Sequence, residues 1–117
     1  MSKPLVQQVC ERARGLVGNP GTWTQFATAR SDNHKACEPT DKRAVRFCAY
    51  GAILRAAYDI AGNDATAEQL TDQAAKLVTG QDNVFAAFEE LIGTNDGPRA
   101  TARRDVLALF DGAAVKV

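Results

Sequence analysis

Cys48 is the residue that most invites a catalytic interpretation, because a thiol becomes a nucleophile when its pKa is lowered. In the helix expected around it, Cys48, Arg55 and Asp59 fall on one side. Arg55 is about two turns away, roughly 10 Å along the axis, which is too far for direct pairing. His34, the only histidine, would have to fold back over the helix to act as a base. Packing in the core is therefore the favoured role of Cys48.

A thiol-dependent enzyme is kept as an alternative from another functional class. It would use Cys48 as nucleophile, His34 as base and Asp32 or Asp96 as the orienting group. This alternative predicts that Cys48 is alkylated faster at neutral pH than Cys10 and Cys37.

The same residues offer only an incomplete set of metal ligands. His34, Cys37 and Cys48 supply three side chains without the second closely spaced pair that structural zinc sites carry. We therefore expect neither a metal ion nor another cofactor, and the interpretation leans away from an enzyme.

The elements that would position these side chains are helices. The central one, ending at Gly62, contains the stretch Phe47–Gly62, which is apolar nearly all round and carries only two charges. Such a helix is expected to be surrounded by others, with Thr40 or Asp41 as its N-cap. Capping and hydrophobic periodicity predict four more helices, which begin near Ser2, at Thr66 with Gln69 as a capping box, after Asp82 or Asn83, and at Thr101.

Residues 22–41 form the irregular part of the chain, where we expect a short hairpin or ordered loop that returns through Lys35–Cys37. A segment of this length needs an anchor, and Trp23 is the candidate. A second turn-rich loop is expected over Gly93–Pro98. The predicted fold class is all-α: a single five-helix domain, residues 1–117, built around the central helix.

Composition limits the functional classes. The chain has 117 residues, of which 45% are hydrophobic and 24% charged, and its 14 basic side chains balance 14 acidic ones. That balance disfavours a dedicated nucleic-acid binder, whose affinity would come from a basic surface. No apolar run approaches the roughly 20 residues that a membrane crossing needs. Three cysteines at irregular spacing suit a reducing cytoplasm better than a disulfide framework.

We therefore predict a non-enzymatic interaction protein that binds a macromolecular partner, most simply another protein. The predicted binding residues are polar or aromatic groups that no helix core requires: Trp23, Arg30, His34, Arg55 and Asp96. Partner identity and oligomeric state stay open at this stage.

Nucleic-acid binding is a third interpretation. Basic residues open two of the expected helices: Lys42, Arg43 and Arg46 in one, and Arg99, Arg103 and Arg104 in the other. However, a helix-turn-helix assignment would give residues 84–92 as the recognition helix, which has two carboxylates and no basic side chain. Nucleic-acid binding is therefore not favoured.

Three short motifs resemble a family of small uncharacterised bacterial and phage proteins, a domain of unknown function. They are Trp23, the stretch Phe47–Ala52 read as Phe-Cys-x-x-Gly-Ala, and the pair Asn95–Asp96 before the last helix. The resemblance spans residues 23–113. Thr94 departs from it, since an aromatic residue precedes the Asn-Asp pair in that pattern. The resemblance implies a compact soluble protein, often encoded near mobile elements, with an accessory or partner-binding role.

Overall fold

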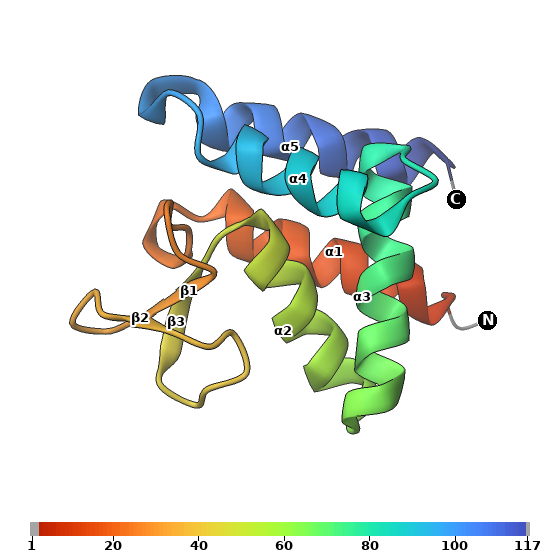
Figure 1. Cartoon of the computed structure of the whole chain (residues 1–117), viewed down its shortest axis with the longest axis horizontal. Coiled ribbons are helices and arrows are strands. Elements are labelled where there is room, and N and C mark those ends of the chain that lie inside the picture. The colour runs from red at the N-terminus through yellow and green to blue at the C-terminus, as the bar shows by residue number, and fades with distance from the viewer. Residues whose placement is uncertain (1–2, 117) are drawn as a thin grey trace.

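A computed structural model describes residues 3–116, which form five α-helices and a small sheet (Figure 1). The helices are α1 (Leu5–Gly18), α2 (Ala49–Ala61), α3 (Asp64–Thr79), α4 (Val84–Asn95) and α5 (Arg99–Lys116). Between α1 and α2 lie the short 3-10 helix η1 (Pro20–Thr22) and the strands β1 (Ala29–Ser31), β2 (Ala36–Cys37) and β3 (Ala44–Phe47). The predicted helices are thus present. Within this part of the chain, none of the helices has the length and apolar character that crossing a bilayer requires.

The sheet corrects the all-α prediction. Its strand order is β2-β1-β3, and β1 is antiparallel to both neighbours. The predicted hairpin is confirmed, because β1 pairs with β2 and Ala29 lies opposite Cys37. The strand β3 was not expected. Ala44 and Phe47 at its ends are buried, while Val45 is exposed. The sequence pattern assigns these residues to the central helix, but their backbone hydrogen bonds are made with β1.

Consequently α2 begins at Ala49, and the expected caps Thr40 and Asp41 are wrong. Cys48 occupies the N-cap position, where its Sγ accepts a hydrogen bond from the backbone N–H of Gly51 at 3.3 Å. Asp41 instead closes a turn by accepting from the backbone N–H of Arg43 at 2.8 Å. Hydrogen bonding to Arg43 lowers the pKa of Asp41 to about 2.

The start of α3 also differs from the prediction. Asn63, not Thr66, caps α3, because its side chain accepts from the backbone N–H of Thr66 at 2.8 Å. The predicted capping box of Thr66 and Gln69 is therefore wrong. At α4 the alternative Asn83 is confirmed, since its Oδ1 accepts from two backbone N–H groups. The prediction for Ser2 falls outside the described residues.

The loop before the last helix is shorter than expected. α4 continues through Asn95, and α5 begins at Arg99 rather than Thr101. The expected loop over Gly93–Pro98 is thus reduced to residues 96–98. Because the link is this short, the end of α4 and the start of α5 are held together beside the segment that follows α1 (Figure 1).

The hydrophobic core lies where α1 and α2 pack against each other and against the remaining helices. α2 packs against α1, α3 and α4, as expected of a central helix, whereas α5 packs mainly on α1, α3 and α4. Fully buried Ile53 of α2, Val9 and Val17 of α1, Leu91 of α4 and Val106 of α5 meet in one cluster. Burial of these side chains holds the helices together and gives the irregular segment a rigid base.

Candidate binding site

Asn95, at the end of α4, joins three parts of the chain. Its side chain is completely buried. The Oδ1 atom accepts from Trp23 Nε1 at 2.8 Å and from the backbone N–H of Ala49 at 2.9 Å, and Nδ2 donates to the carbonyl of Thr24 at 3.0 Å. One amide thus ties the segment after α1 and the start of α2 to α4. The prediction that Trp23 anchors the irregular segment is confirmed, because Trp23 is only 8% exposed.

The start of α2 presses against the same segment. The backbone N–H of Cys48 donates to the Thr28 carbonyl at 3.2 Å. A Cβ at Gly51 would overlap that carbonyl oxygen, so only glycine permits this approach. The Phe-Cys-x-x-Gly-Ala stretch therefore combines an N-cap at Cys48 with a close-approach position at Gly51.

Phe26 is presented to solvent by this framework. Its side chain is 72% exposed, and its backbone has a φ of 64°, in the left-handed region that bulky residues rarely adopt. Asp96 Oδ1 accepts from the backbone N–H of Phe26 at 2.9 Å, and the neighbouring Gln25 donates to the carbonyls of Asn95 and Gly97. The α4–α5 link thus holds an exposed aromatic ring in a strained conformation, a combination that occurs at functional sites.

Phe26 borders a hollow of about 400 Å³ that we call the arginine cleft. It lies between the segment after α1, the sheet and the start of α5. Its lining residues are Pro20, Trp23, Thr24, Gln25, Phe26, Arg30, His34, Arg46 and Arg99. The cleft therefore combines three guanidinium groups with aromatic rings.

Uncharged groups contact the three guanidinium groups. Arg30 donates to Thr24 Oγ1 and to the carbonyls of His34 and Gln25. Arg46 Nη1 donates to the Ser31 carbonyl at 3.2 Å, and Arg99 lies over the Trp23 ring at 5.9 Å. Among the described residues, none of the three has a carboxylate within ion-pair distance. Their positive charge is thus positioned without being neutralised.

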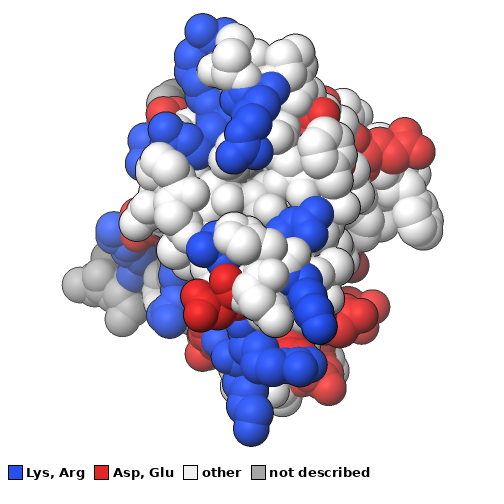
Figure 2. All heavy atoms as spheres, turned by 90° about the vertical axis from the view of Figure 1, so that its left-hand side faces the viewer, with Lys and Arg blue, Asp and Glu red and all other residues white. Residues whose placement is uncertain are grey.

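A second hollow continues from the arginine cleft along α5, and shares Trp23 and Arg99 with it. It adds Arg14, Arg103 and Arg104. Figure 2 shows the face that carries the sheet and the start of α5, where Lys and Arg spheres extend from the top of the view to the bottom. This face is therefore richer in positive charge than a chain of balanced composition would suggest.

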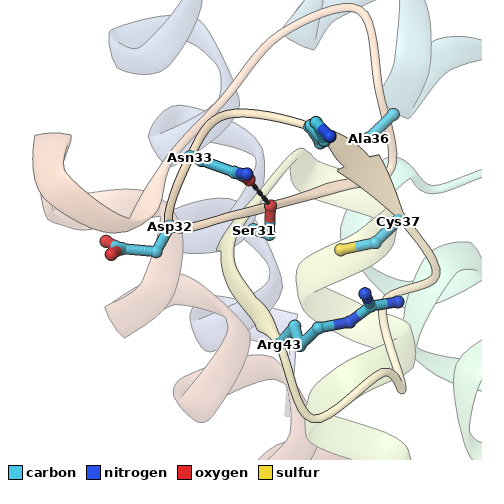
Figure 3. Close-up of a pocket in the computed structure, with 7 residues that line it drawn as sticks. Ser31, Asp32, Asn33, Ala36, Cys37 and Arg43 are labelled. Atoms are coloured by element: carbon cyan, nitrogen blue, oxygen red, sulfur yellow. Dashed lines mark hydrogen bonds between the residues drawn. The ribbon is translucent and has the colours of Figure 1, made fainter.

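A third hollow lies at the hairpin, separate from the arginine cleft. Its lining includes Ser31, Asp32, Asn33, Cys37 and Arg43. Figure 3 shows the Ser31–Asn33 hydrogen bond at its rim and the Arg43 guanidinium beside Cys37. Cys37 is half-buried, whereas Cys10 and Cys48 are buried.

The alternative nucleophile gains no support from this geometry. Cys48 is 4% exposed, lies outside the residues that line the cleft, and its sulfur accepts a helix-capping hydrogen bond. Burial raises the pKa of Cys48, which is the opposite of what a reactive thiolate needs. His34 lines the cleft and Asp96 holds the Phe26 backbone. Over the described residues, no group of three His, Cys, Asp or Glu side chains is placed to hold a metal ion.

The structure brings together four of the five predicted binding residues. Trp23, Arg30 and His34 line the cleft, and Asp96 supports Phe26 at its edge. Arg55 is not among the lining residues. It pairs with Asp59 at 3.2 Å and donates to the carbonyls of Pro39 and Asp41, so it clamps a loop.

Sequence reasoning missed Phe26, and it mentioned Arg46 and Arg99 only as basic helix starts. Arg46 was placed on the central helix, and its true position on β3 directs it toward the cleft. No local signal marks the positive φ of Phe26, because Asp96, which holds it, lies 70 residues away in the chain.

Comparison with known families assigns the chain to one of them. The match to the Family of unknown function (DUF6197) covers residues 1–116. The chain belongs to this family. Comparison with curated proteins and with solved structures gives no match.

Proposed function

We propose that this protein is a non-enzymatic interaction protein that binds an acidic segment of a protein partner through the arginine cleft. The observation that carries the proposal is the set Arg30, Arg46 and Arg99, which line one hollow and, within the described part of the chain, have no carboxylate at ion-pair distance. Arginines fixed in this way attract an anionic group and orient it by directed hydrogen bonds.

Phe26 supplies the second part of the binding surface. An exposed aromatic ring beside arginines is typical of the residues that dominate binding energy at interfaces. Because the Phe26 backbone is strained and its ring is largely exposed, burial of the ring contributes little to folding. Docking of a partner would bury it. The resemblance to a family of small uncharacterised bacterial and phage proteins, which implies an accessory or partner-binding role, supports the same function.

The partner surface therefore consists of Trp23, Phe26, Arg30, His34, Arg46 and Arg99, with Asp96 positioning Phe26 from behind. Trp23 acts mainly as a wall, because most of its ring is buried. In this proposal Arg55 lies outside the surface.

Capture from a host lysate tests the proposal. Tagged wild-type protein is compared with Arg99→Gln and with Lys76→Gln, which removes the same charge from α3, outside the cleft. We expect a protein that is retained by wild type and by Lys76→Gln after nuclease treatment, and lost with Arg99→Gln. If capture disappears after nuclease treatment, the partner is a nucleic acid and the proposal of a protein partner is wrong. Equal capture by all three would contradict a role for the cleft.

A further inference from the structure

The arginine cleft has hydrogen-bond donors left over after its internal contacts are made. Arg46 uses only Nη1 in its contacts with the Ser31 and Asp32 carbonyls. Arg99 uses only Nη1, in a 3.5 Å contact with Gln25 Oε1. A guanidinium carries more N–H groups than these, arranged in a planar fork. Two arginines therefore keep N–H groups available for a ligand, while Arg30, whose guanidinium makes three hydrogen bonds within the protein, adds positive charge to the lining.

This supply of charge and donors exceeds what one carboxylate accepts. A carboxylate carries one negative charge and is commonly satisfied by a single arginine fork. A phosphate monoester carries nearly two charges at neutral pH and three strong acceptor oxygens, which suits several guanidinium groups at once. We infer that the arginine cleft binds the phosphate group of a phosphorylated side chain on the protein partner. This inference rests on the proposed function.

Phe26 defines what accompanies the phosphate. Its exposed ring belongs to the same lining as Arg99. An apolar residue next to the phosphorylated one would pack on this ring. The ligand is thus a phosphorylated segment with an apolar neighbour.

The charge distribution favours this local anion over a nucleic-acid strand. A strand would need unpaired cations along the neighbouring hollow on α5. There Arg14 is paired with Asp111 at 2.6 Å, and Arg104 with Asp105 at 3.4 Å. Arg103 in the same hollow donates to the Gly18 carbonyl at 2.8 Å and, among the described residues, has no carboxylate within ion-pair distance. The cleft, with Arg30, Arg46 and Arg99, therefore holds more uncompensated charge than the rest of the hollow, whereas single-strand binding uses a positive groove that follows the backbone over several nucleotides.

Trp23 provides a direct readout, because it lines the cleft and is the only tryptophan in the chain. Its fluorescence is followed while the full chain is titrated with a short leucine-flanked phosphoserine peptide. The same peptide with serine, the same peptide with aspartate, and a short single-stranded oligonucleotide are titrated in parallel. We expect a saturable change with the phosphoserine peptide, at least about tenfold weaker binding of the aspartate peptide, and no response to serine.

Variants assign the response to the cleft. Arg99→Gln and Arg46→Gln should each weaken phosphopeptide binding about tenfold, whereas Lys76→Gln should leave it unchanged. Arg99 is exposed, so Arg99→Gln decides the question if Arg46→Gln fails to fold.

The outcomes separate this inference from the function on which it rests. Equal binding of the aspartate and phosphoserine peptides would overturn phosphate recognition and leave an acidic partner in place. Absence of any peptide response, while lysate capture still depends on Arg99, would overturn it as well. Tighter binding of the oligonucleotide than of the phosphopeptide would replace the inference by nucleic-acid binding.

Discussion

The indole N–H of Trp23 donates to Asn95 Oδ1 at 2.8 Å, across 72 positions of sequence. The same oxygen accepts the backbone N–H of Ala49, the first residue of α2. Three segments carry the family resemblance: Trp23, Phe47–Ala52 and Asn95–Asp96. They therefore meet at the buried side-chain amide of Asn95. These motifs build the support behind the arginine cleft, and its charged lining comes from other residues.

Asn95→Ala should destabilise the protein by at least about 3 kcal/mol. It leaves the Trp23 N–H, the Ala49 N–H and the Thr24 carbonyl without their partner, and each buried unsatisfied group costs about 1–3 kcal/mol. Urea unfolding monitored by circular dichroism measures the loss. Asn63→Ala, which removes only an exposed helix cap, is the matched control and should cost about 1 kcal/mol. Similar losses for the two variants would contradict a special role for Asn95.

Gly51→Ala should prevent stable folding or cost at least about 3 kcal/mol, because the new Cβ meets the backbone carbonyl of Thr28, which cannot move without displacing the segment. Gly93→Ala is the control. It lies in α4 with nothing near an added Cβ, so the change should stabilise by about 0.5–1 kcal/mol. Thermal unfolding of both proteins provides the comparison, and a Gly51→Ala variant as stable as wild type would contradict the packing described.

Cys37 should be the first cysteine to react with iodoacetamide at neutral pH. It is half-buried, whereas burial raises the pKa of Cys10 to about 11 and also raises that of Cys48. Less thiolate and less access both slow the two buried residues. Peptide mass spectrometry over a time course gives the three rates. Faster labelling of Cys48 than of Cys37 would restore the thiol-enzyme alternative.

Stability should fall as the pH rises from about 9 to 11. Burial, with a smaller effect of Glu11, raises the pKa of Cys10 to about 11 in the folded protein. The unfolded chain therefore loses this proton first, and stability that is fully present below pH 9 is lost as pH approaches 11. The expected loss from Cys10 is about 2 kcal/mol. Urea unfolding across this range should show a shallower decline for Cys10→Ala; an identical decline would contradict the assignment.

Sequence reasoning predicted what depends on local chemistry. Hydrophobic periodicity identified the helices, turn residues identified the β1–β2 hairpin, and the need for an anchor identified Trp23. It failed where distant residues decide. The stretch Ala44–Phe47 is apolar enough to extend the central helix, and only pairing with β1 makes it a strand. Asn95–Asp96 looks like a turn, and only the folded chain brings Trp23 and Phe26 to it.

The same limit explains the candidate site. The prediction of Trp23, Arg30, His34 and Asp96 rests on the absence of a role for them in any helix core. This criterion suits the polar residues, whereas Trp23 is 8% exposed and belongs to the core cluster. Arg46 escaped it because the strand was missed. Arg55 met it, although its hydrogen bonds serve the loop at Pro39.

Phe26 allows stability and binding to be separated. Phe26→Asn places a residue that tolerates the left-handed region at a φ of 64°, so stability should stay the same or rise by about 1 kcal/mol. Phe85→Asn is the matched control, because Phe85 on α4 is 73% exposed and Phe26 is 72% exposed. Thermal unfolding of both variants establishes that any change in binding is not a change in folding.

The most direct measurement is therefore quantitative capture of the partner from nuclease-treated lysate by wild type, Phe26→Asn and Phe85→Asn at equal concentration. If the arginine cleft with its exposed ring is the binding surface, Phe26→Asn loses most of the captured partner while Phe85→Asn retains it. Equal capture by the two variants would contradict the account.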